Sequence, residues 1–131
     1  MRSLATITLV VADYDEAIDF YVGRLGFALS GDTDMGGGKR FVTISVGGGA
    51  KLLLAKADGV DQVARIGDQT GGRVGFFLET DDFSRDHARF LAKGVRFLEQ
   101  PRVEPYGTVA VFEDLYGNRF DLIEPKTAEN G

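Results

Sequence analysis

Asp121 is the residue of this sequence best placed to do chemistry. It stands in the middle of the segment 119–123, Arg-Phe-Asp-Leu-Ile, where residues alternate as in a β-strand with one buried face. A carboxylate there can ligate a metal ion, bind a cationic or hydroxylated ligand, or act as a general base. It can equally serve only as the partner of an arginine such as Arg119 or Arg73, because buried charges are seldom left unpaired. The sequence leaves both interpretations open.

The other residue types that usually carry chemistry are scarce. The sequence contains no cysteine, which excludes disulfides, thiolate nucleophiles and cysteine-ligated metals. Its single histidine, His87, lies between Phe83 and Phe90 at helical spacing. One imidazole does not satisfy a transition metal, so we expect His87 to lie on the helix surface or at the edge of the core. We expect neither a metal nor another cofactor.

Hydrophobic periodicity predicts two helices among strands. Asp13 is a good N-cap for a helix that runs to Leu25, and Gly26 should end it. The elements expected in the first half are strand 4–11, this helix, and strands 27–30, 40–46 and 51–55. Those expected in the second half are strand 73–80, helix 82–93, and strands 95–103, 108–113 and 119–124. The order βαβββ thus occurs twice, which predicts an α+β fold.

The two halves also match in residue type at an offset of 68 positions. The matches fall on helix caps, on the glycines that end helices, on a turn glycine and on inward strand positions, where a shared backbone constrains residue type. The pairs are Asp13 with Asp81, Gly26 with Gly94, Phe27 with Val95, Leu29 with Phe97, Ile44 with Phe112, Gly49 with Gly117, Leu52 with Phe120 and Leu54 with Leu122. So many coincidences at one offset, without a gap, indicate a duplicated unit.

We therefore expect one domain over residues 1–131, made of two modules. The first module is 1–57, the linker 58–72, the second module 73–125 and a short polar tail 126–131. The turn segment 114–118, Asp-Leu-Tyr-Gly-Asn, has the residue types of a structural turn rather than of a site.

Composition limits the classes of partner. The chain has 131 residues, of which 44% are hydrophobic and 27% charged, values ordinary for a soluble globular domain. A net charge of −5 without a cluster of lysine or arginine argues against nucleic acid. No apolar run approaches the roughly 18 residues of a membrane span, and no signal peptide precedes the first strand. We expect a cytoplasmic protein with no membrane partner.

With this repeat, the sequence resembles the vicinal oxygen chelate superfamily. The opening TLVVADYDEAIDFYVGRLGF, the closing VFEDLYGNRFDLIEP and the tandem βαβββ plan carry the resemblance, which covers Leu4 to Pro125. That superfamily includes glyoxalase I, bleomycin-resistance proteins, fosfomycin-resistance enzymes and extradiol dioxygenases. The resemblance implies a cupped mixed sheet around a cleft, and usually a homodimer that completes the cleft. It indicates fold better than activity, because the superfamily carries many chemistries on one scaffold.

Metal-using members of the superfamily have four ligands at equivalent points of the repeat. The resemblance places them at Thr6 and at either Val74 or Gly75 in the first strand of each module, and at Leu53 and Asp121 in the last strand. One of these side chains is a carboxylate and none is an imidazole. The resemblance therefore implies a degenerate metal site.

The remaining candidates describe a binding pocket. Alternation puts Thr6 and Thr8 on the cleft face of the first strand. A proline-stiffened segment presents Arg102 and Tyr106 beside the expected cleft mouth, and loops of this kind carry specificity. A mostly apolar pocket with a few polar anchors is typical of a small-molecule site. The predicted ligand-binding residues are Thr6, Thr8, Leu53, Gly75, Asp121, Arg102 and Tyr106, and Asp121 is also the candidate catalytic residue.

Two classes of function follow. The first is a small-molecule-binding protein of the glyoxalase/bleomycin-resistance type, which binds or sequesters an organic ligand without converting it. The second is a lyase, isomerase or dioxygenase of the same superfamily, working without a metal through Asp121 or with a non-standard metal site. The missing histidines favour the first class. A purely structural role has little support, because a cleft lined by Thr8, Leu53 and Asp121 has no obvious purpose in a scaffold.

Overall fold

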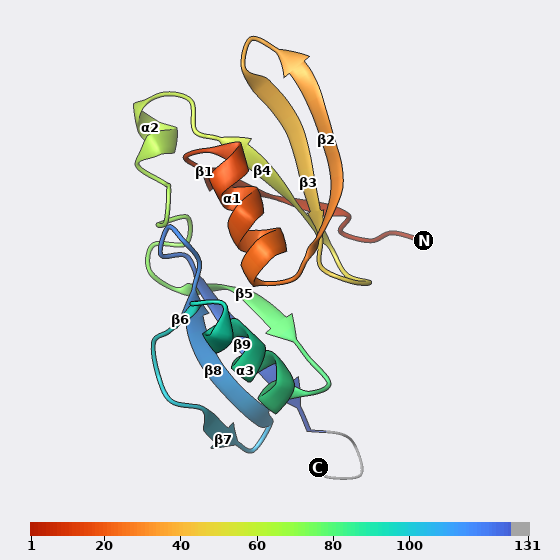
Figure 1. Cartoon of the computed structure of the whole chain (residues 1–131), viewed down its shortest axis with the longest axis vertical. Coiled ribbons are helices and arrows are strands. Elements are labelled where there is room, and N and C mark those ends of the chain that lie inside the picture. The colour runs from red at the N-terminus through yellow and green to blue at the C-terminus, as the bar shows by residue number, and fades with distance from the viewer. Residues whose placement is uncertain (127–131) are drawn as a thin grey trace. The chain divides into compact units, whose positions relative to one another are not determined.

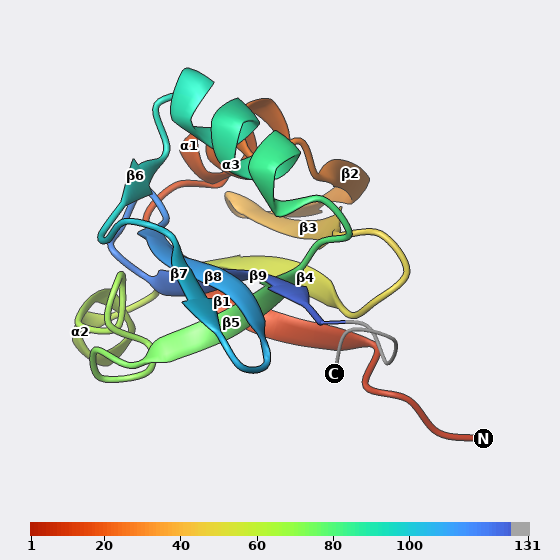
Figure 2. The same ribbon diagram turned by 90° about the horizontal axis from the view of Figure 1, so that it is seen from below.

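The computed structural model describes residues 1–126 and divides them into two compact units that join between Gln69 and Thr70. Each unit has the order strand, helix, then further strands, so the predicted α+β fold is confirmed (Figure 1). In each unit the helix lies over one face of its own sheet (Figures 1 and 2). No helix within the described residues is long and apolar enough to span a membrane.

In the described part of the chain, the first unit forms a four-stranded mixed sheet with the order β1-β4-β3-β2. Strand β1 runs parallel to β4, and the other neighbours are antiparallel. The strands are β1 (Thr6–Val11), β2 (Ala28–Gly36), β3 (Lys39–Ser45) and β4 (Lys51–Lys56). The helices are α1 (Tyr14–Ile18), which continues as the π-helical segment η1 (Asp19–Arg24), and the short α2 (Val60–Val63). Alternation decides the core, since Leu9, Leu52 and Leu54 are buried on the helix side.

The second unit forms a mixed sheet with the order β5-β9-β8-β6, and β7 pairs with β8. Its elements are β5 (Val74–Glu79), α3 (Phe83–Ala92), β6 (Arg96–Phe97), β7 (Arg102–Glu104), β8 (Gly107–Glu113) and β9 (Arg119–Pro125). The single strand predicted over 95–103 is therefore wrong, because it is two short strands. Pro101 precedes the second of them and has no backbone N–H to give to a sheet.

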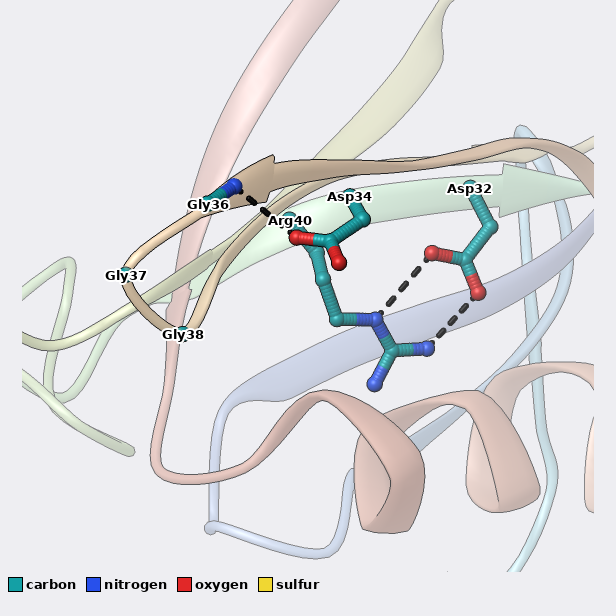
Figure 3. Close-up of a pocket in the computed structure, with 6 residues that line it drawn as sticks. All are labelled: Asp32, Asp34, Gly36, Gly37, Gly38 and Arg40. Atoms are coloured by element: carbon teal, nitrogen blue, oxygen red, sulfur yellow. Dashed lines mark hydrogen bonds and ion pairs between the residues drawn. The ribbon is translucent and has the colours of Figure 1, made fainter.

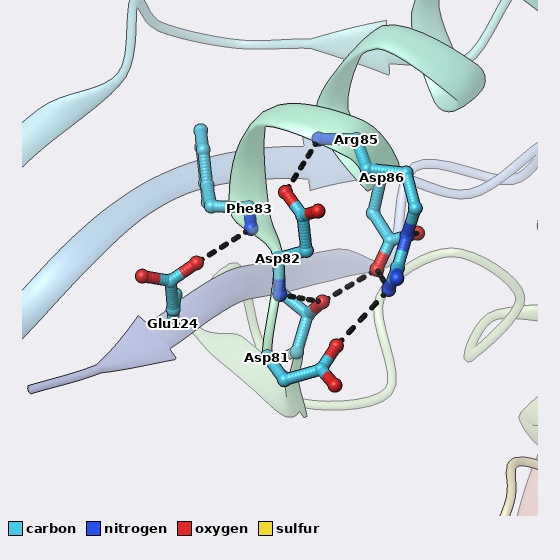
Figure 4. Close-up of polar contacts among 7 residues, drawn as sticks. Asp81, Asp82, Phe83, Arg85, Asp86 and Glu124 are labelled. Carbon is cyan, nitrogen blue, oxygen red and sulfur yellow. Dashed lines mark hydrogen bonds and ion pairs between the residues drawn. The ribbon is translucent and has the colours of Figure 1, made fainter. Parts of the chain in front are cut away.

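Helix α3 begins at Phe83 and its N-cap is Asp82, so the cap at Asp81 that the offset of 68 predicted is wrong. The Asp82 carboxylate accepts a hydrogen bond from the backbone N–H of Arg85 at 3.1 Å (Figure 4). Glu124 on β9 accepts the N–H of Phe83 at 2.8 Å, which satisfies another free donor of the first turn. Asp81 instead forms an ion pair with the Arg85 guanidinium at 3.1 Å.

Strand register shows that the repeat holds but that its offset is not constant. Thr6 pairs with Lys51 as Val74 pairs with Arg119, an offset of 68. Further along, Ile7 pairs with Leu52 in the first unit and Phe76 pairs with Phe120 in the second. Equivalent residues of the first strands, β1 and β5, are therefore 69 positions apart from here on, while those of the last strands remain 68 apart. The register shift between Val74 and Phe76 leaves Gly75 as the extra residue, a β-bulge in the second unit.

The offset returns to 68 inside the helices. The two caps, Asp13 and Asp82, are 69 apart, whereas the glycines that end the helices, Gly26 and Gly94, are 68 apart. The helix of the first unit takes up its additional residue as a π-turn, in which Leu25 N–H donates to Phe20 carbonyl at 3.0 Å. The second unit has one extra residue in its first strand, and the first unit has one extra residue in its helix. The two insertions cancel, so the offset between equivalent residues is again 68 after the helices. The prediction of a repeat without a gap is corrected accordingly.

Candidate functional site

Three of the predicted site residues lie on the first sheet, on the face opposite the helix. Thr8 stands across from Leu53 in the parallel register of β1 and β4, and Thr43 stands across from Leu53 on β3. Thr6 precedes Thr8 by two residues and shares its face. Thr6 and Thr8 are exposed, Leu53 is half-buried and Thr43 is buried. This face therefore offers threonine hydroxyls around an apolar centre.

Gln69 also lies in this unit and was not selected from the sequence. Its side-chain amide donates to the carbonyl of Thr8 at 2.7 Å and accepts from the N–H of Val10 at 2.9 Å. The amide therefore pairs with the outer edge of β1 as a neighbouring strand would. It fixes the backbone that carries Thr6 and Thr8. A glutamine in a polar linker is too common to be a signal in a single sequence.

Asp121 lies on β9 with its side chain on the face opposite α3. The flanking Phe120 and Leu122 are buried against the helix side, while Asp121 is half-buried. Its Oδ1 atom is buried and has no hydrogen-bond partner among the residues that the structure describes. An unsatisfied carboxylate oxygen is costly in free energy, and such groups mark strained or functional positions.

The charges around Asp121 come from one cluster. Burial raises the pKa of the Asp121 carboxyl, and the negative charge of Glu99 acts in the same direction. The positive charge of Arg102 opposes both and lowers that pKa, but the net pKa of Asp121 remains above its usual range. Arg102 influences Asp121 through its charge, and Oδ1 of Asp121 makes no bond to Arg119 or Arg73, the partners that the sequence suggested.

Arg102 is held by two glutamates. Its Nε and Nη2 donate to the two carboxylate oxygens of Glu99 at 2.8 and 3.2 Å, and its Nη1 donates to Glu104 at 2.8 Å. Glu99 also accepts the backbone N–H of Val111 on β8 at 2.9 Å, so the cluster is tied to the sheet. These bonds hold the pKa of Glu99 below its usual range, chiefly through Arg102. Tyr106, in the turn before β8, is exposed.

Phe77 is the site residue that sequence reasoning missed. It stands directly across from Asp121 in the parallel register of β5 and β9, where Thr8 stands in the first unit. Val111 stands across from Asp121 on the other side, so the three share one face. The Phe77 side chain is 67% exposed. At the constant offset of 68 the counterpart of Thr8 is Phe76, and only the bulge at Gly75 brings Phe77 to this position.

Gly75 contributes space rather than a side chain. A Cβ atom at this position would lie 2.6 Å from Cγ2 of Thr70, closer than such contacts occur. The Thr70 hydroxyl donates to the carbonyl of Arg73 at 2.6 Å and so closes the turn that leads into β5. The bulge residue is small because this turn packs against it. Register also makes Val74, rather than Gly75, the counterpart of Thr6.

The four positions at which the superfamily carries metal ligands do not fit a divalent transition metal in this chain. They hold Thr6, Val74, Leu53 and Asp121, which together provide one carboxylate and no imidazole. Within residues 1–126, no group of three or more histidine, aspartate or glutamate side chains is placed to hold a metal ion. His87, as expected, lies at the edge of the core, with its ring 5.3 Å from that of Phe83 and 4.4 Å from that of Phe97.

A pocket of about 450 Å³ lies at the β2–β3 hairpin, away from the predicted residues of this unit (Figure 3). Asp32, Asp34, Arg40 and the glycines 36–38 line it. Asp32 accepts two bonds from the Arg40 guanidinium, at 3.1 and 2.7 Å, and Asp34 accepts the N–H of Gly36 at 2.8 Å. A third bond, to Asp15 at 2.9 Å, ties Arg40 to helix α1. These bonds already satisfy the polar groups, and we interpret the pocket as a structural feature of the hairpin.

Comparison with known proteins gives consistent similarities over the whole chain. The family model for the Glyoxalase/Bleomycin resistance protein/Dioxygenase superfamily matches residues 3–122. An uncharacterized protein of Shewanella frigidimarina (strain NCIMB 400) is 52% identical over 126 residues, which is 94% of this chain and 93% of that protein. Among solved structures, UcmS2 has a TM-score of 0.80 at 29% identity, covering 95% of this chain and 99% of its own. TnmS3, an antibiotic binding protein from Streptomyces sp. CB03234, has a TM-score of 0.76 at 29% identity, covering 96% and 98%.

Proposed function

The chain belongs to the glyoxalase/bleomycin resistance protein/dioxygenase superfamily, and on that premise we propose that it binds a small organic molecule without converting it. We place the binding surface on the open face of the second sheet, around Asp121. The observation that carries the proposal is the Oδ1 atom of Asp121, which is buried and lacks a hydrogen-bond partner among the described residues. A ligand that donates a hydrogen bond to this oxygen would remove its desolvation penalty.

Two further observations support a binding role. Phe77 and Val111 flank Asp121 on the same sheet face, which combines one polar anchor with apolar surface, as small-molecule sites do. TnmS3, which is 29% identical to this chain over nearly its whole length, is an antibiotic binding protein. The predicted residues Thr6, Thr8 and Leu53 provide a comparable open face in the first unit. In the second unit Arg102 acts on Asp121 through its charge, and Tyr106 acts on Arg102.

An enzyme remains the second candidate because of one observation. Burial raises the pKa of Asp121, and a carboxyl whose pKa is raised toward neutrality is suited to general acid or base catalysis. A lyase or isomerase reaction that needs a single proton transfer would fit one such carboxyl. The other three superfamily ligand positions hold Thr6, Val74 and Leu53 and so provide no second carboxylate or imidazole, which makes binding the stronger candidate.

A screen with product analysis separates the two functions. Small organic compounds are added to ¹⁵N-labelled protein, and those that shift backbone amides of β5 and β9 are incubated with it and then analysed by mass spectrometry. Recovery of the bound compound unchanged supports the binding role. Conversion that stops in Asp121→Asn supports the enzyme. A broad screen in which no compound shifts these amides contradicts both.

The metal content gives a first prediction. The protein purified without a tag should contain less than about 0.1 zinc, nickel or iron per chain, because three of the four superfamily ligand positions lack a metal-binding side chain. Elemental analysis by mass spectrometry measures this directly. About one metal ion per chain, lost in Asp121→Ala, would show that a non-standard site exists and that the proposal is wrong.

A homodimer is the second prediction. Phe41, on the open face of the first sheet, is 50% exposed, and exposed apolar surface of this kind often marks an interface. Sedimentation velocity at micromolar concentration should therefore give twice the chain mass of 14.2 kDa. A single species at the mass of one chain at these concentrations would contradict the prediction.

A further inference from the structure

The arrangement of Phe77 and Asp121 limits the class of ligand. We infer that the ligand is a planar aromatic compound that carries a hydrogen-bond donor and no negative charge, with its ring on Phe77 and its donor on Oδ1 of Asp121. This inference rests on the proposed function, because it describes what the same surface would bind. It stands on the positions of these two residues and on the charges beside them.

The aromatic requirement comes from Phe77. Its ring is 67% exposed and stands on the strand next to Asp121, at the same level of the sheet. Adjacent strands lie about 4.8 Å apart, so a ring stacked on Phe77 brings its own edge substituents over Asp121. Phe76, the preceding residue, instead stacks on Phe120, with ring centroids 4.5 Å apart on the helix side. The bulge at Gly75 thus places one phenylalanine in the core and the next on the open face.

The donor requirement comes from the unsatisfied oxygen. Oδ1 of Asp121 is buried, and its two neighbours across the sheet, Phe77 and Val111, have no side-chain donor. A hydroxyl or N–H group on the ligand would provide the missing hydrogen bond. A ligand without a donor would leave the oxygen buried and unpaired, at a large cost in affinity.

The exclusion of anions comes from the neighbouring cluster. Arg102 is the cation that acts on Asp121, and its Nε, Nη1 and Nη2 already donate to Glu99 and Glu104. Two glutamates against one arginine leave this cluster with a net negative charge, before Asp121 is counted. An anionic group bound at Asp121 would therefore meet repulsion from this cluster, whose guanidinium is already paired with two carboxylates.

Four matched probes test the three requirements. 2-Naphthol is planar and has a donor, 2-methoxynaphthalene lacks the donor, decahydro-2-naphthol lacks the aromatic ring, and 2-naphthoate adds a negative charge. Dissociation constants are measured from ¹H–¹⁵N shifts of the β5 and β9 amides. We expect 2-naphthol to bind at least fivefold more tightly than each of the other three.

Variants assign each preference to its residue. Phe77→Leu should remove the preference for 2-naphthol over decahydro-2-naphthol, and Asp121→Val should remove the preference over 2-methoxynaphthalene. Matched controls are Asp81→Asn, an acid whose side chain is 91% exposed, and Leu91→Ala, an exposed apolar residue of α3, both of which should keep the selectivity. Because Asp121→Val is a strand substitution, its ¹H–¹⁵N spectrum is first checked for a folded protein. If Asp121→Val does not fold, the donor requirement is tested only by the selectivity of the unmodified protein among the four probes.

Equal binding of decahydro-2-naphthol, equal binding of the methyl ether, or tighter binding of 2-naphthoate would overturn the inference. So would the absence of shifts with all four probes. If none of them binds while a non-aromatic compound from the wider screen shifts the same amides, the inferred class is wrong and the proposed function stands. If no compound shifts these amides, the proposed function is wrong as well.

Discussion

Asp114→Ala is expected to lower the free energy of unfolding by roughly 2–4 kcal/mol, because it strands several buried donors at once. Asp114 is 4% exposed, and its Oδ1 accepts the backbone N–H groups of Tyr116 and Asn118, both at 2.9 Å. Its Oδ2 accepts the Asn118 side-chain amide at 2.9 Å. Denaturant unfolding monitored by circular dichroism measures the loss.

Two variants control this measurement. Asp114→Asn keeps one acceptor oxygen and should lose clearly less stability than Asp114→Ala. Asp81→Ala removes an aspartate whose side chain is 91% exposed and should change stability by no more than about 0.5 kcal/mol. A loss for Asp114→Ala as small as that for Asp81→Ala would show that the turn does not depend on this carboxylate.

The turn at Asp114 also bears on the candidate site. It connects β8 to β9, and the register that it sets places Asp121 across from Val111. Its residue types, an aspartate followed by Gly117 in the left-handed region at φ +98°, indicated a structural turn from the sequence, and the hydrogen bonds confirm that interpretation. Turn chemistry is local, and it is therefore one of the features that a single sequence reveals best.

Periodic features were equally predictable. The alternation of β9 puts Phe120 and Leu122 in the core and Asp121 on the opposite face, because side chains of a strand alternate whatever lies around it. The helix end at Gly26 followed from its need for a positive φ, which is +76° in the structure. Each of these inferences depends on a few neighbouring residues and on backbone geometry alone.

Features that depend on tertiary pairing were not predictable. Strand β2 continues from the predicted 27–30 to Gly36 through Gly31 and Asp32, residues with low strand propensity, because it pairs with β3 and because Asp32 binds Arg40. The bulge at Gly75 and the π-turn of the first helix cancel in the sequence, so the constant offset concealed both. Phe77 was not selected from the sequence for this reason, whereas Asp121 was.

Asp121→Asn is expected to weaken the binding of a donor ligand roughly tenfold to a hundredfold, because a charge-assisted hydrogen bond contributes about 1.5–3 kcal/mol. Asparagine keeps the volume of the side chain and removes its charge. Titration calorimetry with a ligand that shifts the β9 amides measures the change. Asp81→Asn, which removes the charge of an acid whose side chain is 91% exposed, should leave the affinity unchanged.

The same variant should melt at the same temperature as the unmodified protein or higher at neutral pH. Burial raises the pKa of Asp121 in the folded state above its ordinary value of 3.8, so the folded protein binds this proton more tightly than the unfolded chain does. The contribution of Asp121 to stability therefore falls as the pH rises from 3.8 to the raised pKa, and the full penalty persists above that pKa. Asparagine does not titrate, so the variant escapes this penalty.

A series of melting curves from pH 3 to pH 8 therefore tests the role of Asp121. The difference in melting temperature between Asp121→Asn and the unmodified protein should be smallest near pH 3, where the carboxyl is largely protonated in both states, and should grow in favour of the variant toward pH 7. Acids that do not interact with Asp121 titrate identically in the two proteins and cancel in the difference. If Asp121 instead anchored an arginine, the substitution would strand that cation, and the variant would melt well below the unmodified protein at neutral pH. The two roles predict differences of opposite sign, so this series decides between a ligand-binding carboxylate and a structural one.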